Sequence, residues 1–472
     1  MSARLICVSN RVALPQKTDV PGGLAVGVLG ALKHTGGVWF GWGGELTDGE
    51  PGPVEIQIRE GVTYATFDLR REQFHRYYNG YSNDALWPLF HYMPSKFRFK
   101  GDEHDAYQEV NRRFASQLAP LLKDDDVIWV HDYHLIPLAC RLRELGVRCP
   151  IGFFLHIPFP HIEVLRVLPT YAELVKDLAS YDVVGFQSEP DLESFMGASE
   201  RIFGSDCIVA PKQLNVGGRR LTADVFPIGV DVAAIQEEAI QAAQNDVVRR
   251  LTDSLLGRKL MIGADRLDYS KGLVERFAAY EQFLAAFPEN RGRITYLQIA
   301  PLSRKDVQSY VEIRRALEQA AGRTNGKFAD TDWTPIRYVN RNYPREVLMG
   351  LLRVSNVGLV TPLRDGMNLV AKEFLAAQDP EDPGVLVLST FAGAARELSA
   401  ALIVNPYDTR AVGHAIQTAL TMPLVERRER HAALLTTLAQ SDIHRWVERF
   451  IAALRHTTPI IERGRIAGGA QR

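Results

Sequence analysis

Residues 355–374 read "SNVGLVTPLRDGMNLVAKEF", and this stretch decides the fold. The apolar run at 357–360 has no polar alternation, which is typical of a strand buried on both faces. An Arg-Asp-Gly turn follows, and the segment from Leu369 onward has the composition of a helix. A buried strand that leads through a turn into a helix is the repeating unit of a parallel α/β sheet. The turn carries more charge than turn formation requires, so it is also a candidate site.

The same alternation of apolar run and helical segment recurs along the chain. Residues 272–287, "GLVERFAAYEQFLAAF", have the apolar spacing of an amphipathic helix. The predicted strands are residues 4–9, 127–130, 151–155, 183–186, 260–264, 294–300, 336–339, 357–360 and 385–389. These strand–helix units are too many for one sheet. We therefore predict an α/β protein with two Rossmann-like, doubly wound parallel-sheet domains facing across a cleft.

A domain boundary is predicted near residues 226–247, where a strand end leads into a polar helix. We place the N-terminal domain at 1–232 and the second domain at 233–455. The polar, Gly-rich tail 456–472 is predicted to be disordered.

Composition excludes several classes of protein. The 472 residues are 46% hydrophobic and 24% charged, and the formal net charge is -1, so no global field attracts nucleic acid or anionic lipid. No uncharged apolar run reaches the roughly 18 residues of a membrane helix, and the first apolar run is too short for a signal peptide. The four cysteines include no C-x-x-C pair, which favours reduced thiols. We expect a cytoplasmic protein without nucleic-acid or membrane partners.

Charged residues follow the predicted strands of the second half. Arg266 and Lys271 come after the strand at 260–264, where a helix begins, and Arg304 follows the next strand. Helix N-termini favour anions, so paired cations there suit a diphosphate. The alternative is a solvated turn with an Arg–Asp pair. In the turn after 357–360, Asp365 is suited to sugar hydroxyls and Glu373 to a ribose diol, although Glu373 could simply complement the helix dipole.

The first half offers weaker signals. Arg11 follows the first strand, and the Gly22–Gly23 turn permits close approach to a phosphate. Neither a G-x-G-x-x-G fingerprint nor a P-loop occurs, which disfavours dinucleotide and P-loop nucleotide sites.

Histidines and acidic residues raise the question of a metal site. They are His131, Asp132, His134 and His156, all at predicted strand ends, and the run 124–126. The histidines lack firm ligand spacing, so hydrogen-bonded core residues are the favoured interpretation and no metal is expected. The acidic run precedes its strand and is predicted to be a solvated loop. The aromatic segment 76–92 is predicted to be a loop that covers a satellite core or presents a sugar-binding surface.

Eight segments in chain order closely resemble those of bacterial trehalose-6-phosphate synthases: "VSNR", "GGLAVG", "YYN…LWP", "WVHDYHL", "FFLHIPFP", "DRLDYSKGL", "TPLRDGMNLVAKEF" and "LIVNPYD". That family consists of retaining glycosyltransferases of the GT-B fold, whose final helix packs back on the N-terminal domain. The resemblance implies transfer of glucose from a nucleotide donor, usually UDP-glucose, to glucose 6-phosphate, without a cofactor or required metal. It leaves open the base (UDP, GDP or ADP) and a homo-oligomeric state.

The resemblance also implies a role for each matched position. The expected catalytic residues are Arg266, Lys271, Asp365 and His156. The expected donor-binding residues are Gly22, Gly23, Arg266, Lys271, Tyr343, Asp365, Leu369, Val370, Ala371, Lys372 and Glu373, with residues 369–373 acting through their backbone. The expected acceptor-binding residues are Arg11, Tyr78, Trp87, Asp132 and Arg304, of which Arg11, Tyr78 and Arg304 would hold the phosphate.

Two other functions remain possible on this scaffold. One is a related GT-B transferase or pseudo-glycosyltransferase with a different phosphorylated acceptor. The other is a non-catalytic sugar-nucleotide sensor, whose mark would be loss of Arg266, Lys271 or Asp365. All three residues are present.

Overall fold

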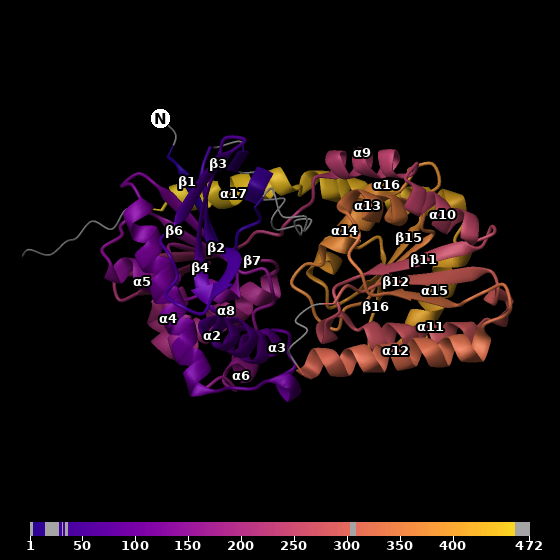
Figure 1. The fold of residues 1–472 in the computed structure, drawn as a ribbon, viewed down its shortest axis with the longest axis horizontal. Coiled ribbons are helices and arrows are strands. Elements are labelled where there is room, and N and C mark those ends of the chain that lie inside the picture. The colour runs from indigo at the N-terminus through magenta and orange to yellow at the C-terminus, as the bar shows by residue number, and fades with distance from the viewer. Residues whose placement is uncertain (1–2, 15–27, 31, 34–35, 303–307, 458–472) are drawn as a thin grey trace, which may run out of the picture.

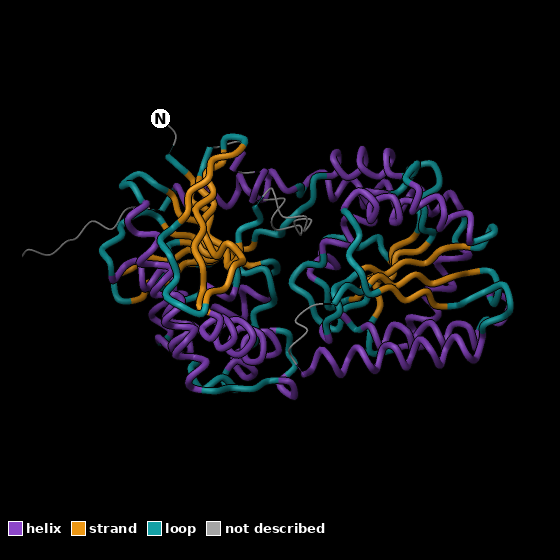
Figure 2. The backbone as a smooth tube through the Cα atoms, viewed as in Figure 1, coloured by secondary structure: helices purple, strands orange, loops and turns teal. Residues whose placement is uncertain are grey.

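Two separate sheets, each flanked by helices, form the core of the molecule (Figure 2). The computed structural model of the chain describes residues 3–14, 28–30, 32–33, 36–302 and 308–457. No helix in these ranges is long and apolar enough to cross a membrane. The α/β, doubly wound prediction is confirmed, and each predicted strand is present.

The first sheet has ten strands in the order β3-β4-β2-β1-β5-β6-β7-β10-β9-β8. Pairing is parallel from β4 to β10 and antiparallel at the two margins. The strands are β1 Leu5–Arg11, β2 Val38–Thr47, β3 Glu55–Arg59, β4 Val62–Arg70, β5 Val127–His131, β6 Ile151–Phe154, β7 Val183–Phe186, β8 Ile208–Ala210, β9 Gln213–Val216 and β10 Arg219–Val225.

One face of this sheet is covered by helices from the same half of the chain (Figure 1). These helices are α2 Arg71–Phe74, α3 Trp87–Phe90, α4 Gly101–Leu118, α5 Leu138–Glu144, α6 Ile162–Leu165, α7 Tyr171–Leu178 and α8 Glu189–Phe203.

The second sheet has six strands in the order β13-β12-β11-β14-β15-β16, all parallel. They are β11 Lys259–Ala264, β12 Ile294–Ile299, β13 Ile336–Val339, β14 Val357–Val360, β15 Val385–Ser389 and β16 Leu402–Val404. One face carries α9 Val232–Ala242, α10 Asp246–Ser254, α13 Arg345–Arg353, α14 Leu369–Ala377 and α16 Leu424–Gln440 (Figure 1). The other carries α11 Leu273–Ala286, α12 Gln308–Phe328 and α15 Thr409–Thr421.

The chain crosses between the two sheets twice. It leaves the first sheet after β10, and it returns with α17 Ile443–Arg455, which lies on the first sheet (Figure 1). On α17, Phe450 stacks on Trp129 of β5 with ring centres 4.7 Å apart. At the crossings, Gly229 lies so close to residues 441–442 that a Cβ there would stand 2.0 Å from the Ser441 carbonyl oxygen. The predicted boundary at 232/233 stays a prediction, and residues 458–472 lie outside the described ranges.

The aromatic segment 76–92 corrects one expectation, because it is helical and not a loop. A π-helix, His75–Leu86, joins α2 to α3 without a break. Its i→i+5 hydrogen bonds change the spacing of inward-facing side chains, so the 3.6-residue pattern could not reveal it. Tyr77 and Tyr81 of this helix are buried in the core of the first half.

Candidate active site

The loop after β11 holds the first group of predicted residues. Asp268 caps a 3-10 turn, Tyr269–Lys271, by accepting from Ser270 N at 2.9 Å. The predicted alternative, an Arg–Asp pair in a solvated turn, does not describe Arg266. Asp265 of this loop pairs at 2.6 Å with the buried Arg276 of α11 and not with Arg266, which is exposed.

Arg266 instead faces the first half of the molecule. Its guanidinium carbon lies 5.7 Å from the centre of the Trp87 ring in α3, a cation–π distance. The Trp87 indole Nε1 donates to Asp268 Oδ1 at 3.4 Å, and Tyr310 of α12 donates to Asp268 Oδ2 at 2.8 Å. Arg266, predicted to bind the nucleotide-sugar donor, and Trp87, predicted to bind the acceptor sugar, therefore meet at one point between the sheets.

The turn after β14 holds the second group. Lys271 Nζ lies 2.5 Å from Asp365 Oδ2, and Asn368 Nδ2 donates to the same oxygen at 3.0 Å. Asn368 has φ 70° and starts α14, a left-handed conformation that asparagine tolerates. Gly366 packs on the other half: a Cβ at that position would stand 2.1 Å from the His156 carbonyl oxygen. Lys271, Asp365 and His156 are thus gathered at one place.

Within α14, the charged side chains point in different directions. Glu373 is buried and accepts from Arg345 Nη1 at 3.0 Å, while burial raises the pKa of its carboxyl. Lys372 is fully buried and donates to the Ile228 carbonyl at 2.8 Å and to Glu397 at 2.5 Å. The Lys372 side chain is therefore structural, and only its backbone can serve a ligand, as expected for Leu369, Val370 and Ala371. Tyr343 lies under Arg341, with the guanidinium 4.6 Å from its ring.

Three of the predicted acceptor residues, Arg11, Tyr78 and Asp132, lie on or directly beside elements of the first half. The Arg11 guanidinium lies 5.7 Å from the Trp42 ring centre. Tyr78 of the π-helix stacks on His134 with ring centres 5.5 Å apart. Asp132 follows β5 with φ 76° and ψ 164°, a conformation that costs a non-glycine residue energy and clusters at functional sites.

His156 lies beside Asp132. Its backbone N donates to Asp132 Oδ1 at 3.3 Å, and its ring Nε2 is 3.2 Å from His131 Nδ1. Burial lowers the pKa of His156 to about 3 and also lowers the pKa of His131, so both rings are neutral near pH 7.

Three predicted site residues lie outside the described residues, and three residues of the candidate site were not predicted. Gly22, Gly23 and Arg304 lie outside the described residues. The residues that sequence reasoning missed are Trp42, Asp268 and Arg345. Trp42 lies in "VWFGWGG", where glycines interrupt the strand pattern, and Asp268 is the second carboxylate of the quoted "DRLDYSKGL" segment.

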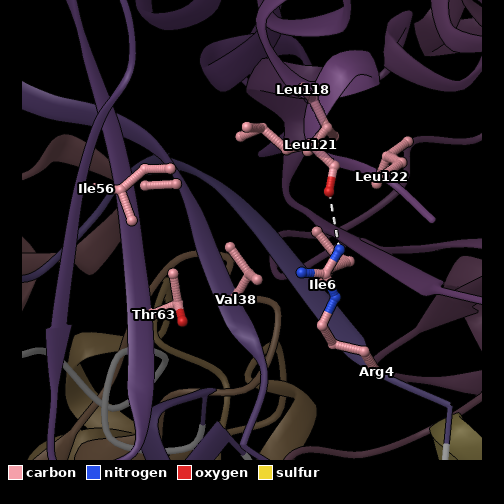
Figure 3. Close-up of a pocket in the computed structure, with 9 residues that line it drawn as sticks. Arg4, Ile6, Val38, Ile56, Thr63, Leu118, Leu121 and Leu122 are labelled. Carbon is pink, nitrogen blue, oxygen red and sulfur yellow. Dashed lines mark hydrogen bonds between the residues drawn. The ribbon is translucent and has the colours of Figure 1, made fainter.

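A small cavity of about 80 Å³ lies away from these groups (Figure 3). It is lined by Arg4, Ile6 and Val38, among others, near the amino ends of β1 and β2, whereas ligands of such sheets bind at the carboxyl ends. Arg4 also corrects the prediction for residues 124–126: it pairs at 2.7 Å with Asp126, which is buried, so only Asp124 and Asp125 are solvated. Among described residues, no three His, Cys, Asp or Glu side chains are grouped as metal ligands.

Known proteins are similar to this chain in both sequence and fold. A trehalose-6-phosphate synthase from Klebsiella pneumoniae is 48% identical over 468 residues, covering 99% of this chain and 98% of the relative. The crystal structure of an α,α-trehalose-phosphate synthase (UDP-forming) from Burkholderia xenovorans in complex with glucose-6-phosphate superposes with a TM-score of 0.91. It is 48% identical and covers 96% of this chain and 100% of its own. An E. coli structure bound with UDP-2-fluoro glucose has a TM-score of 0.91, is 47% identical, and covers 97% of this chain and 100% of its own.

The profile of one family spans almost the whole chain. Residues 9–456 match glycosyltransferase family 20, and this range contains both strand-end groups described above. The two-sheet architecture agrees with that of the solved relatives. The chain belongs to glycosyltransferase family 20.

Proposed function

We propose that the protein is an α,α-trehalose-phosphate synthase (UDP-forming), a retaining hexosyltransferase of trehalose biosynthesis. It moves glucose from UDP-glucose to the anomeric hydroxyl of glucose 6-phosphate, giving α,α-trehalose 6-phosphate and UDP. The observation that carries the proposal is the meeting of the two strand-end groups, where Arg266 lies over Trp87 and Gly366 packs on His156.

Each group has a distinct task in this reaction. Arg266 and Lys271 stabilise charge on the departing diphosphate, and this stabilisation lowers the barrier only if the cations are preorganised. Asp365 holds Lys271 in place at 2.5 Å and accepts hydrogen bonds from the donor glucose. Glu373 receives the ribose hydroxyls, and Trp87 with Asp132 holds the acceptor sugar in line.

Retention of configuration does not need a covalent intermediate here. The incoming hydroxyl attacks on the face from which UDP leaves, and an oxygen of the leaving phosphate takes its proton. The C–O bond to UDP breaks as the new glycosidic bond forms, so UDP departs carrying that proton. Positioning and charge stabilisation are then the protein's contribution.

The test is an assay of purified protein with glucose 6-phosphate and each nucleotide-glucose in turn, following nucleotide release. UDP release that requires both substrates, with trehalose 6-phosphate as product, is the expected result. Donor binding without turnover would identify a sensor instead. Turnover only with another phosphorylated acceptor would identify the related transferase.

We also propose that no metal is required, because Arg266 and Lys271 can neutralise the diphosphate. Activity should largely survive exhaustive EDTA treatment. Complete loss that one divalent ion restores would contradict the proposal and direct attention to His131, His134 and Asp124.

A cytoplasmic location is part of the same proposal. All four cysteines, which lie in the described residues, carry free thiols, and such usage is typical of a reducing compartment. A homo-oligomeric state stays a prediction, and size-exclusion chromatography with light scattering would test it.

A further inference from the structure

His131 ends β5 directly behind His156, in a position that no proposed substrate contact uses. The two rings are joined by one short contact, 3.2 Å between His131 Nδ1 and His156 Nε2. His131 is fully buried, whereas His156 is only half-buried. The contact therefore links a ring of the interior to a ring at the edge of the site.

Because both rings are neutral, one nitrogen of this contact donates a proton and the other accepts it. Two arrangements satisfy the distance. Either His131 carries its proton on Nδ1 and donates it, or His156 carries its proton on Nε2 and donates it to His131. The choice depends on the other nitrogen of His131.

That other nitrogen, His131 Nε2, is buried and has no hydrogen-bond partner among the described residues. If His156 were the donor, Nε2 of His131 would carry a buried proton with nowhere to donate it. Trp446 Nε1 and Trp129 Nε1, on rings 6.2 Å and 4.5 Å from His131, are also buried and have no partner among the described residues, so three unpaired N–H donors would share one apolar cluster. If His131 is the donor, Nε2 holds only an unused lone pair, and orphaned acceptors are less rare than orphaned N–H groups.

Aromatic side chains fix the His131 ring in this orientation. Trp129 lies 4.5 Å away between ring centres, and Trp446 of α17 contacts His131 and His156 together. Phe154 packs edge-on to His156 at 4.7 Å. A close-packed cage of this kind opposes rotation of either ring.

We propose that His131 is a positioning residue: it donates a hydrogen bond from Nδ1 to Nε2 of His156 and so fixes the tautomer of His156 that carries its proton on Nδ1. His156 then presents a neutral N–H donor to a hydroxyl of the donor glucose. The inference rests on the proposed function for its catalytic consequence, but the tautomer itself does not depend on activity.

Two variants of nearly equal shape test the hydrogen bond. In His131→Asn, the side-chain Nδ2 takes the place of the histidine Nδ1 and can still donate. In His131→Leu, the branched side chain fills similar space and cannot donate. We expect kcat to fall about tenfold or more in His131→Leu, the rate equivalent of one lost hydrogen bond. His131→Asn should stay within about threefold of the parent protein. The dissociation constant for UDP, measured by calorimetry, should be unchanged in both, because UDP lacks the sugar.

The second measurement reads the tautomer directly in the unaltered protein. Long-range ¹H–¹⁵N spectra of histidine-labelled protein distinguish a protonated Nδ1 from a protonated Nε2, and His156→Gln identifies the His156 signals. We expect a protonated Nδ1 on His156. A proton on Nε2, or equal kcat values in the Asn and Leu variants, would overturn the proposal. If the unaltered protein lacked synthase activity, the proposed function would fail while the spectra still decided the tautomer.

Discussion

At Glu373, a ligand-binding role must be separated from a role in holding Arg345. Arg345 is bound by both Glu373 and Glu238, so it keeps one carboxylate partner if Glu373 is neutralised. Glu373→Gln removes a charge-assisted acceptor for the ribose hydroxyls, worth about 1.5–3 kcal/mol. We expect the dissociation constants for UDP and UDP-glucose to rise together, as measured by calorimetry. A small loss of stability with unchanged UDP affinity would return Glu373 to a helix-dipole role.

Asp365 should behave differently, because it lies against Lys271 and not against the ribose-side Arg345. Asp365→Asn removes the charge that pairs with Lys271, so affinity for free UDP should be retained or increased. Turnover should fall strongly, because the hydroxyls of the donor glucose lose the carboxylate that accepts their hydrogen bonds. Isothermal calorimetry with UDP and steady-state kinetics together check this pattern. An unchanged kcat would contradict it.

The sequence predicted where single site residues lie in the fold only when those residues directly follow a predicted strand. Arg266, Lys271 and Asp365 were placed correctly at the carboxyl ends of strands, since parallel strands present those ends on one edge. The directions of side chains were not predictable. Lys372 turns into the core and binds Ile228 and Glu397, and this direction was not predictable because both partners are distant in sequence.

At the scale of elements, α3 and the turn at 269–271 form one contact between the halves. Asp268 receives Trp87 and Tyr310, and removing its charge should loosen Trp87. We expect Asp268→Asn to raise KM for glucose 6-phosphate more than the dissociation constant for UDP. Tyr310→Phe is the control, because it removes a donor from Asp268 without touching Trp87. Equal weakening of both substrates in Asp268→Asn would indicate general damage to the turn.

Helix α7 carries a buried acid whose titration affects stability. Burial raises the pKa of Asp177 to about 7 from 3.8, so the folded state holds a proton that the unfolded state has released between those values. Stability contributed by the protonated acid is therefore present at low pH and is lost as pH rises through about 7. Relative to the parent protein, Asp177→Asn should gain about 4 kcal/mol between pH 4 and pH 8, from roughly three pKa units at about 1.4 kcal/mol each. Chemical denaturation at both pH values measures the difference, and a parallel pH dependence in both proteins would contradict it.

The predicted strands include the partly buried β13 as well as the central strands, and the strands that were missed have an interrupted, alternating or short apolar pattern. The central strands, such as β5 and β14, are continuous apolar runs. Glycines interrupt the pattern of β2, and β3 is an edge strand with Ile56 and Ile58 exposed, so its alternation does not indicate a core face. In the β8–β10 segment, β8 and β9 are short, and only Leu214, Leu221 and Ala223 are buried.

At the scale of the whole molecule, the two crossings touch at Gly229. A methyl group there would overlap the Ser441 carbonyl, so Gly229→Ala should lower the free energy of unfolding by about 1–3 kcal/mol. Gly197→Ala is the matched control, because Gly197 lies within α8 with open space around its missing Cβ. That change should be neutral or stabilising by up to about 1 kcal/mol. Thermal unfolding of both variants checks the contrast, and equal effects would mean that the crossings have room to separate.

The contact of the crossings has a mechanical consequence. Two covalent connections that meet at one place act as a pivot for the two halves, and α17 begins close to that pivot. Trp446, in the first turn of α17, lies against His131 and His156. Because α17 lies on the first sheet, a rotation of the second half about this pivot would leave Trp446 against the two imidazoles and would separate Gly366 from the His156 carbonyl. Opening at the pivot would thus separate the turn that carries Asp365 from His156 without disturbing the packing of the two rings.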